Sequence, residues 1–98
     1  MIFNEFDRGV LENLFEISIR DMEINVDVAR DEMFRSVLND KDGVDLALGI
    51  ALGTIHTSFI AGFRQRNGRK MNSEEKSELW EITKSKLGQL REAIFQCG

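Results

Sequence analysis

The chain of 98 residues contains no proline and no tyrosine, and it has only one cysteine, one histidine and one tryptophan. Average usage of about 5% would place roughly five prolines in a chain of this length. Because proline removes a backbone N–H and clashes with the preceding helical turn, its absence favours long helices. The many Leu, Glu, Lys and Arg residues favour the same structure, since all four are good helix formers.

The single cysteine, Cys97, cannot form a disulfide within the chain, and this favours a reducing, cytoplasmic setting. Residues 1–5 form neither a basic region nor an apolar run, so no signal peptide is predicted. The length predicts one domain, residues 1–98, with a core that buries roughly 60–70% of the unfolded surface. Such a modest core is often shared with a second chain, and we therefore expect self-association.

The formal net charge is −4 and the pI is about 5.0, which argues against a protein whose whole surface binds nucleic acid. The charge is unevenly spread along the chain. Residues 1–48 carry twelve acids and five bases (net −7), and residues 49–98 carry five acids and eight bases (net +3). The two halves are expected to attract each other, within one chain or across a head-to-tail pair.

Residues 4–39 carry apolar side chains at spacings of three and four, which predicts amphipathic helix. Asn4 is the expected N-cap. A single helix over 4–39 is one interpretation, but the β-branched stretch 24–28 favours a bend that divides the region into two helices. Residues 39–43 predict a turn with Gly43 at positive φ. A row of acids could imitate DNA phosphates, although solvated helix faces carry such rows routinely; its members are Glu5, Glu12, Glu16, Glu23 and Asp27.

The segment 45–66 is apolar nearly all round, which predicts a central helix buried on every side. Small residues follow one edge at four-residue spacing, and glycine inside a helix usually indicates close approach by another helix. We therefore expect this edge, together with the aromatic ring of Phe63 that follows it, to bind a protein partner. The predicted partner-binding residues are Gly49, Gly53, Thr57, Ala61 and Phe63.

A basic run follows the apolar segment, and Gly68 within it is a suitable helix stop. Its members, Arg64, Arg66, Arg69 and Lys70, are the candidates for contact with nucleic acid or an acidic partner. The last helix is predicted over 72–96, where Asn72 and Glu75 have capping-box spacing. Its expected inward stripe is Trp80, Thr83, Leu87, Leu90 and Ile94, widened by Leu79 and Ile82.

His56 is the sole histidine and lies inside the apolar segment, where a hydrogen-bonded core or interface side chain is expected. One histidine cannot form a zinc site without cysteine or carboxylate partners at suitable spacing. The sequence contains no phosphate-binding glycine loop and no nucleophile placed beside a base. We therefore predict no cofactor, no metal and no enzymatic activity.

One acidic cluster resembles an element of a known enzyme family. Glu74, Glu75 and Glu78 match the E-E-x-x-E element that holds magnesium in helical nucleotide pyrophosphatases. The resemblance implies a magnesium-dependent hydrolase, but that family also has a second acidic helix downstream, where this chain has only Glu92. A solvated first turn, favoured by the helix dipole, explains the same acids.

A helix-turn-helix regulator is the main alternative function, over residues 48–70. Gly49 and Gly53 are spaced as the tight turn of that motif requires, and hydroxyl side chains follow that could reach DNA. The basic run 64–70 would then contact phosphates. Against this alternative, the would-be recognition helix is too apolar on its exposed face.

A membrane span over residues 46–63 is a further alternative, because the stretch is eighteen residues long and basic residues follow it. His56 and several hydroxyls lower its hydropathy, and the amphipathic neighbours offer it a soluble setting. We therefore expect an all-α protein: a compact bundle of about four helices with the apolar helix 45–66 at its centre. Its predicted function is protein–protein interaction through apolar helix faces, as an adapter, inhibitor or assembly subunit.

Overall fold

The structure is a computed structural model, and it describes residues 2–38 and 43–97. Five helices account for most of these residues, and no strand occurs among them: α1 (Glu5–Arg20), α2 (Met22–Ala29), α3 (Glu32–Leu38), α4 (Val44–Asn67) and α5 (Ser73–Gln96). The predicted all-α class is confirmed. Of the turn expected over residues 39–43, the structure describes only Gly43, whose φ of 72° is positive as predicted; residues 39–42 lie outside the described residues.

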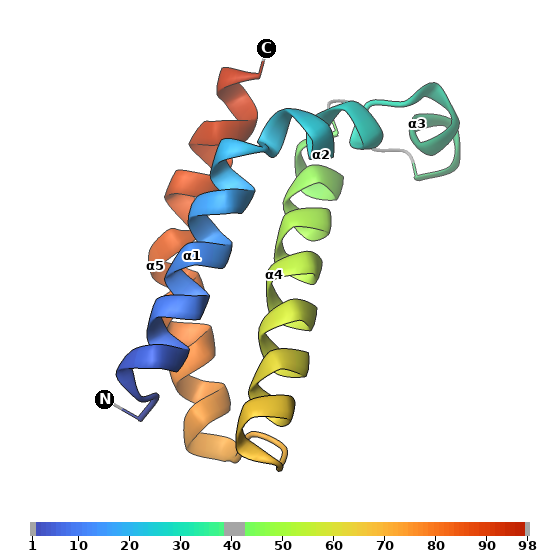
Figure 1. Ribbon diagram of the computed structural model, residues 1–98. Coiled ribbons are helices and arrows are strands. Elements are labelled where there is room, and N and C mark those ends of the chain that lie inside the picture. Colours follow the sequence, from blue (N-terminus) through green and yellow to red (C-terminus); the bar gives the residue numbers. More distant parts are fainter. Residues whose placement is uncertain (1, 39–42, 98) are drawn as a thin grey trace.

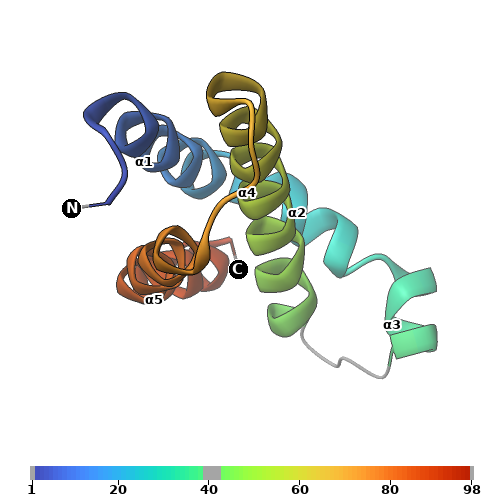
Figure 2. The same cartoon turned by 90° about the horizontal axis from the view of Figure 1, so that it is seen from below.

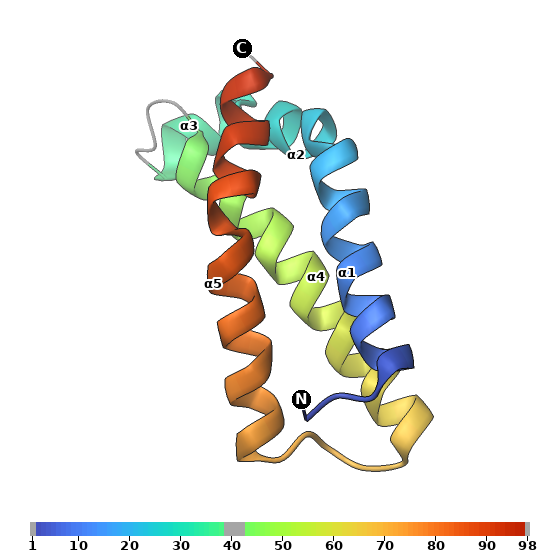
Figure 3. The same cartoon turned by 90° about the vertical axis from the view of Figure 1, so that its left-hand side faces the viewer.

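Helices α1, α4 and α5 form a three-helix bundle, and α2 crosses one end of it (Figures 1 and 2). Figure 3 shows α4 passing obliquely behind α1 and α5, with the two termini at opposite ends of the bundle. Among the described elements, α3 contacts only α2, and it projects beside the end at which α4 begins. The central position predicted for the apolar helix is thus confirmed.

The core lies between α4 and the other long helices. Leu11 and Phe15 of α1 pack there against Ile55, Phe59 and other fully buried side chains of α4. Phe3, ahead of α1, closes the lower end by edge-to-face contacts, with its ring centroid 5.1 Å from that of Phe59. Aromatic pairs in this geometry add stability beyond the area that they bury.

Three predicted helix ends are confirmed: the starts of α1 and α5 and the end of α4. The Oδ1 atom of Asn4 accepts a 2.8 Å hydrogen bond from the Asp7 N–H at the start of α1. Asn72 and Glu75 form the complete capping box of α5, and Gly68 ends α4 at φ 67°. Each of these residues satisfies backbone groups that a helix end leaves unpaired.

The region 4–39 divides at other points than predicted. α1 ends at Arg20, with Asp21 as its C-cap, and a second break at Arg30 and Asp31 separates α2 from α3, so three helices replace the expected two. The β-branched stretch 24–28 stays helical because Met22, Val26 and Ala29, on one side of α2, are buried. Tertiary packing thus overrides the weak helix propensity of this stretch.

Two expectations about buried faces are wrong. Helix α4 is buried along one side only, because no helix of the described chain covers the opposite side. In α5, Leu79 and Ile82 face the core, whereas the predicted core residue Trp80 is 55% exposed. The rest of that stripe lies inside or partly inside: Thr83, Leu87, Leu90 and Ile94.

Candidate functional site

The uncovered side of α4 carries the row of small residues predicted to bind a partner. Successive helical residues are about 100° apart, so positions two apart lie on nearly opposite sides. The buried row Ala51, Ile55, Phe59 and Phe63 is offset by two from the outer row, which consists of Gly49, Gly53, Thr57 and Ala61. All four residues of the outer row are exposed.

No part of the described chain makes close approach to the glycines of the outer row. A Cβ atom added at Gly49 or Gly53 would meet nothing within 4 Å. The close helix approach that the glycine pattern indicates is therefore not made within the described part of the chain.

Phe63 does not belong to this surface, and its prediction as a partner-binding residue is wrong. Its side chain is 1% exposed and packs into the core, where its ring centroid lies 6.0 Å from that of Phe3. Phe63 falls two positions after Ala61, and this offset turns it to the opposite side of α4.

The outer row continues into a shallow hollow that reaches α1 and α2. The part on α4 is lined by Gly49, Ile50, Gly53, Thr54, Thr57 and Ser58. Thr54 also lines a neighbouring hollow, together with Ile17 of α1 and Ile24 of α2. The two hollows therefore form one surface, which we call the outer surface of α4.

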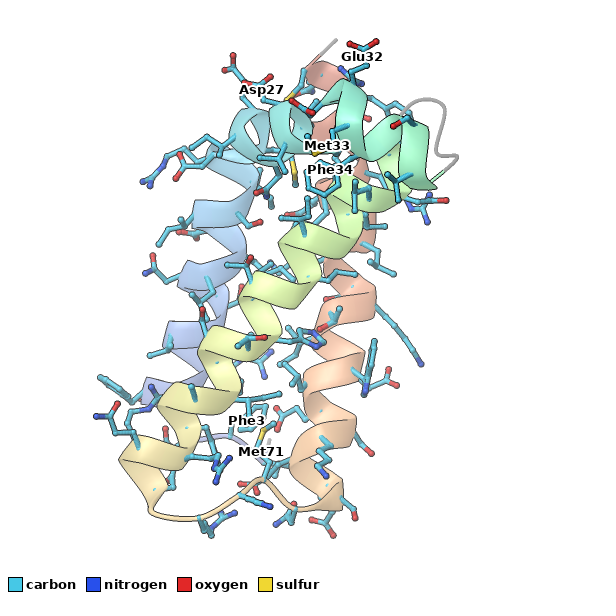
Figure 4. All side chains as sticks on the ribbon, turned by 90° about the vertical axis from the view of Figure 1, so that its right-hand side faces the viewer. Phe3, Asp27, Glu32, Met33, Phe34 and Met71 are labelled. Atoms are coloured by element: carbon cyan, nitrogen blue, oxygen red, sulfur yellow. The ribbon has the colours of Figure 1, made fainter. Side chains whose placement is uncertain are left out.

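Large apolar side chains are exposed on α2 and α3. Ile24 is 65% exposed, Met33 73% and Val37 74%, and Val28 and Phe34 are also exposed. Ile24, Val28, Met33 and Val37 belong to the apolar spacing that predicted amphipathic helix over residues 4–39, yet all four are exposed. Figure 4 shows Met33 and Phe34 near the start of α4, on the face of the molecule where α4 lies in front of α1 and α5.

The basic run at the end of α4 and just after it has two kinds of member, those paired within the fold and those not paired. The Nε atom of Arg66 donates a 2.8 Å hydrogen bond to the buried Asp7 carboxylate, and its guanidinium lies 5.5 Å from the ring centre of Phe6. Arg69 binds both carboxylate oxygens of Glu75, at 2.7 and 3.0 Å. These two residues join structural elements, and their predicted role in contacting a partner has no support in this geometry.

Arg64 and Lys70, the other two members, are exposed and line a cavity of about 370 Å³ between α4 and α5. Lys76 of α5 is the third cation at this cavity, and its remaining lining residues are His56, Ile60, Met71, Leu79 and Trp80. The sequence analysis missed Lys76, Met71 and the exposed position of Trp80. The i,i+4 spacing of Lys76 and Trp80 is the signal that could have placed them on one face of a helix.

His56 is hydrogen-bonded, as predicted, and the direction of its bond can be derived. Its Nε2 lies 2.8 Å from Oγ1 of Thr83, whose hydroxyl donates to the Leu79 carbonyl at 2.8 Å. Because the hydroxyl proton is used there, Nε2 must carry a proton and donate it to Thr83. Nδ1 is then the unprotonated nitrogen, and burial lowers the pKa of the imidazole below its usual value.

Two carboxylates of the acidic cluster 74–78 are engaged in holding the fold. Glu75 binds Arg69 and caps α5, and the guanidinium of Arg69 lowers the pKa of its carboxyl. Glu78 accepts hydrogen bonds from the Ile2 and Phe3 backbone N–H groups and from Arg8. Within the described residues, no three His, Cys, Asp or Glu side chains are grouped so that they could hold a metal ion.

The helix-turn-helix geometry is wrong for this chain. α4 runs without interruption from Val44 to Asn67, and Gly49 and Gly53 lie inside it, so there is no tight turn between two helices. The four-residue spacing of small residues produces an exposed row on one helix instead.

By length and composition, α4 could cross a membrane. Its most apolar window has a mean hydropathy of 1.6, and 33% of that window is buried within the protein. The core helix of a soluble protein passes the same test, so this property alone does not place α4 in a lipid bilayer.

Comparisons with protein-family models, curated proteins and solved structures gave no match.

Proposed function

We propose that this protein is a non-enzymatic protein–protein interaction module, and that its partner packs a helix against the outer surface of α4. One observation carries the proposal: the most apolar helix of the bundle is covered on one side only, and its uncovered side is a row of small residues. Apolar surface that remains exposed in a monomer is a common mark of a binding site.

The glycines of this row support an external contact. Each glycine inside a helix costs about 1 kcal/mol of helix stability relative to alanine. Within the described chain nothing requires Gly49 or Gly53 to lack a Cβ atom, since the space beside each is open. A second helix lying close along the row would require it, because small residues let two helix backbones approach each other.

The proposed partner is a second copy of the chain, with the two α4 helices antiparallel. A two-fold axis near the middle of the row would place Gly49 opposite Ala61 of the other copy, and Gly53 opposite Thr57. Asp45 begins the same row and Arg64 lies beside its other end, and both are exposed. Antiparallel pairing brings the Asp45 carboxylate of each copy toward the Arg64 guanidinium of the other, so the charges are complementary.

The apolar side chains of α2 and α3 would enlarge the interface. A stable interface buries about 800 Å² on each partner, more than four small side chains expose. Ile17 and Ile24 border the outer surface directly, through the hollow that they share with Thr54. Because α3 projects from the bundle, its exposed Met33 and Val37 are available to the same partner.

We place this activity in the cytoplasm. Ile55 and Phe59, in the buried row of α4, are committed to the core that α1 and α5 share. Insertion of α4 into a membrane would remove the core from these helices. The free thiol of Cys97 is compatible with a reducing compartment.

Sedimentation equilibrium tests the proposal with two matched variants. Gly53→Leu places a large side chain on the outer row, and Gly88→Leu places the same side chain at an exposed helical glycine of α5 that also has open space beside it. We expect the wild-type chain and Gly88→Leu to form dimers, and Gly53→Leu to remain monomeric with an unchanged helical circular dichroism spectrum.

A wild-type chain that stays monomeric at about 0.1 mM would contradict the second copy as the partner, because biological dimers commonly associate well below that concentration. Equal dimerisation by Gly53→Leu would contradict the outer surface of α4 as the interface.

A further inference from the structure

We infer that the cavity between α4 and α5 binds an organic anion, a small molecule that carries a carboxylate or phosphate on an apolar body. This inference does not depend on the proposed interaction with a second copy. It is based on the lining of the cavity, on the charges at its rim and on the hydrogen bonding of one wall.

The floor and walls of the cavity are apolar. Leu79 and Met71 are 3% and 8% exposed and form the floor, and the half-exposed Ile60 and Trp80 stand at the sides. The volume of about 370 Å³ falls in the range of roughly 300–1,000 Å³ that is usual for small-molecule sites. An aromatic or branched aliphatic group would replace water over these side chains.

The rim is cationic, and no carboxylate lines the cavity. Arg64, Lys70 and Lys76 converge there from α4, the connecting segment and α5. In the described part of the chain, the charged groups of these three residues form no ion pair. A positive rim in a protein of net charge −4 is a local feature, and it favours an anion.

The carboxylates near the cavity are bound to other groups of the protein. Glu75 is bound to Arg69, and Glu78 to Arg8 and the backbone that precedes α1. The basic segment therefore has two kinds of cation, those neutralised within the fold and those left at the cavity. An anionic ligand group would neutralise the second kind.

His56 supplies a directional polar group to the cavity wall. Its Nε2–H is held by Thr83, and its ring stands edge-on to Trp80 with the centroids 5.3 Å apart. Since Nδ1 carries no proton in the neutral imidazole, it can accept a hydrogen bond from a hydroxyl or from a protonated acid group of the ligand. A few polar groups in a mainly apolar lining are typical of a small-molecule site.

Trp80 is the only tryptophan of the chain and lines the cavity, so its fluorescence reports binding there directly. We would titrate the full chain with 4-phenylbutyrate, 4-phenylbutyl phosphate, the neutral 4-phenylbutanol and inorganic phosphate. We expect a saturable change with at least one organic anion, and binding about tenfold weaker for the alcohol, because it lacks the charged group that the lysines attract. The two organic anions distinguish carboxylate from phosphate recognition.

Charge variants then locate the anion. We expect Lys70→Gln combined with Lys76→Gln to weaken binding of the organic anion about tenfold or more, because two of the three rim cations are lost. Lys84→Gln is the matched control, since Lys84 is an exposed lysine of α5 that pairs with Glu81 and does not line the cavity. Arg64 stays unchanged in this test because it also belongs to the proposed dimer surface.

Three results would overturn the inference: no saturable change with either organic anion, equal affinity for the neutral alcohol, or unchanged affinity in the double lysine variant. Saturable binding of inorganic phosphate as tight as that of the organic anions would also overturn it, because the apolar lining would then have no role.

Discussion

At the scale of single residues, His56 joins α4 to α5 through a hydrogen bond that the neutral imidazole donates. The imidazole donates through Nε2 to Thr83 on α5, and burial lowers its pKa. The charged residues around the same cavity are Arg64, Lys70 and Lys76. His56 is the only histidine of the chain, and its protonation is the change expected at this cavity in mildly acidic solution.

This lowered pKa predicts a loss of stability in mild acid. The unfolded chain takes up the His56 proton near the ordinary pKa of 6.5, whereas the folded chain takes it up only at lower pH. The free energy of unfolding is therefore highest above pH 6.5 and falls as the pH decreases from there toward the folded pKa. Urea unfolding between about pH 7.5 and 5.5 measures the effect.

His56→Gln is the control variant for that experiment. Its side chain does not titrate, so we expect its free energy of unfolding to depend less on pH than that of the wild-type chain. Glu75, whose pKa is lowered by the Arg69 guanidinium, loses its contribution only as the pH falls below its ordinary value of 4.5, outside the range tested. Equal slopes for the wild-type chain and His56→Gln would contradict the prediction.

At the scale of the helical elements, α4 shows how position changes the role of a glycine. Beside Gly49 the space is open, whereas a Cβ at Gly62 would lie 2.7 Å from Nη1 of Arg66. That guanidinium cannot move freely, because its Nε atom is bound to the buried Asp7. Gly62 thus provides room for a salt bridge between α4 and α1, and Gly49 has no such role within the chain.

Alanine substitutions should separate these two roles. We expect Gly49→Ala to raise the free energy of unfolding by about 1 kcal/mol through helix propensity. Gly62→Ala should raise it less or lower it, because the gain is offset by displacement of Arg66 from the Asp7 carboxylate. Thermal or urea unfolding in dilute solution gives both values.

The control for this comparison is a background without the salt bridge. In Arg66→Ala, the obstacle beside Gly62 is absent, so Gly62→Ala should recover a gain similar to that of Gly49→Ala. If Gly62→Ala behaves identically in both backgrounds, the proposed role of Gly62 is wrong.

The elements also show what the sequence could predict. The caps at Asn4, Asn72 and Gly68 were predictable because each depends on local hydrogen bonds or on a local φ value. The bend after α1 was misplaced because burial of Val26 and its neighbours, a tertiary effect, decides which turn stays helical. Trp80 was assigned to the wrong face because Leu79, one position earlier, occupies the core.

The candidate sites were predictable only in part, for the same reason. Four-residue spacing identified the row that contains Gly49 and Gly53, but it could not tell an inner row from an outer one. The basic run was visible as composition, but which of its members are paired depends on Asp7, 59 residues away from Arg66, and on Glu75, 6 residues away from Arg69. A contact as distant in sequence as that of Arg66 with Asp7 is determined by the packed fold.

At the scale of the whole molecule, the acidic first half and the basic second half attract each other within the chain. Asp7 of α1 pairs with Arg66 of α4, and Glu12 of α1 pairs with Lys86 of α5. The charges used in these pairs face the inside of the bundle or its seams. Within residues 2–38 and 43–97, Asp45 and Arg64 form no ion pair, and they lie at the two ends of the outer row, so they are available to a second copy.

Charge exchange at these two positions tests the antiparallel arrangement. Asp45→Lys alone would place two like charges at each end of the interface, and Arg64→Glu alone would do the same with acids. We expect each single variant to weaken dimerisation by about five- to tenfold, since like charges brought together oppose association. The double variant should recover most of the wild-type affinity, because the opposite charges then meet again with their positions exchanged.

Sedimentation equilibrium of the four chains at low salt gives the coupling between the two positions, and the effect should shrink as salt screens the charges. In a parallel dimer Asp45 would lie near Asp45 of the other copy. Asp45→Lys would then replace a pair of acids with a pair of bases, and the repulsion between like charges would remain. The double variant would then show no recovery beyond the sum of the single changes. Recovery in the double variant therefore requires that the two α4 helices run in opposite directions.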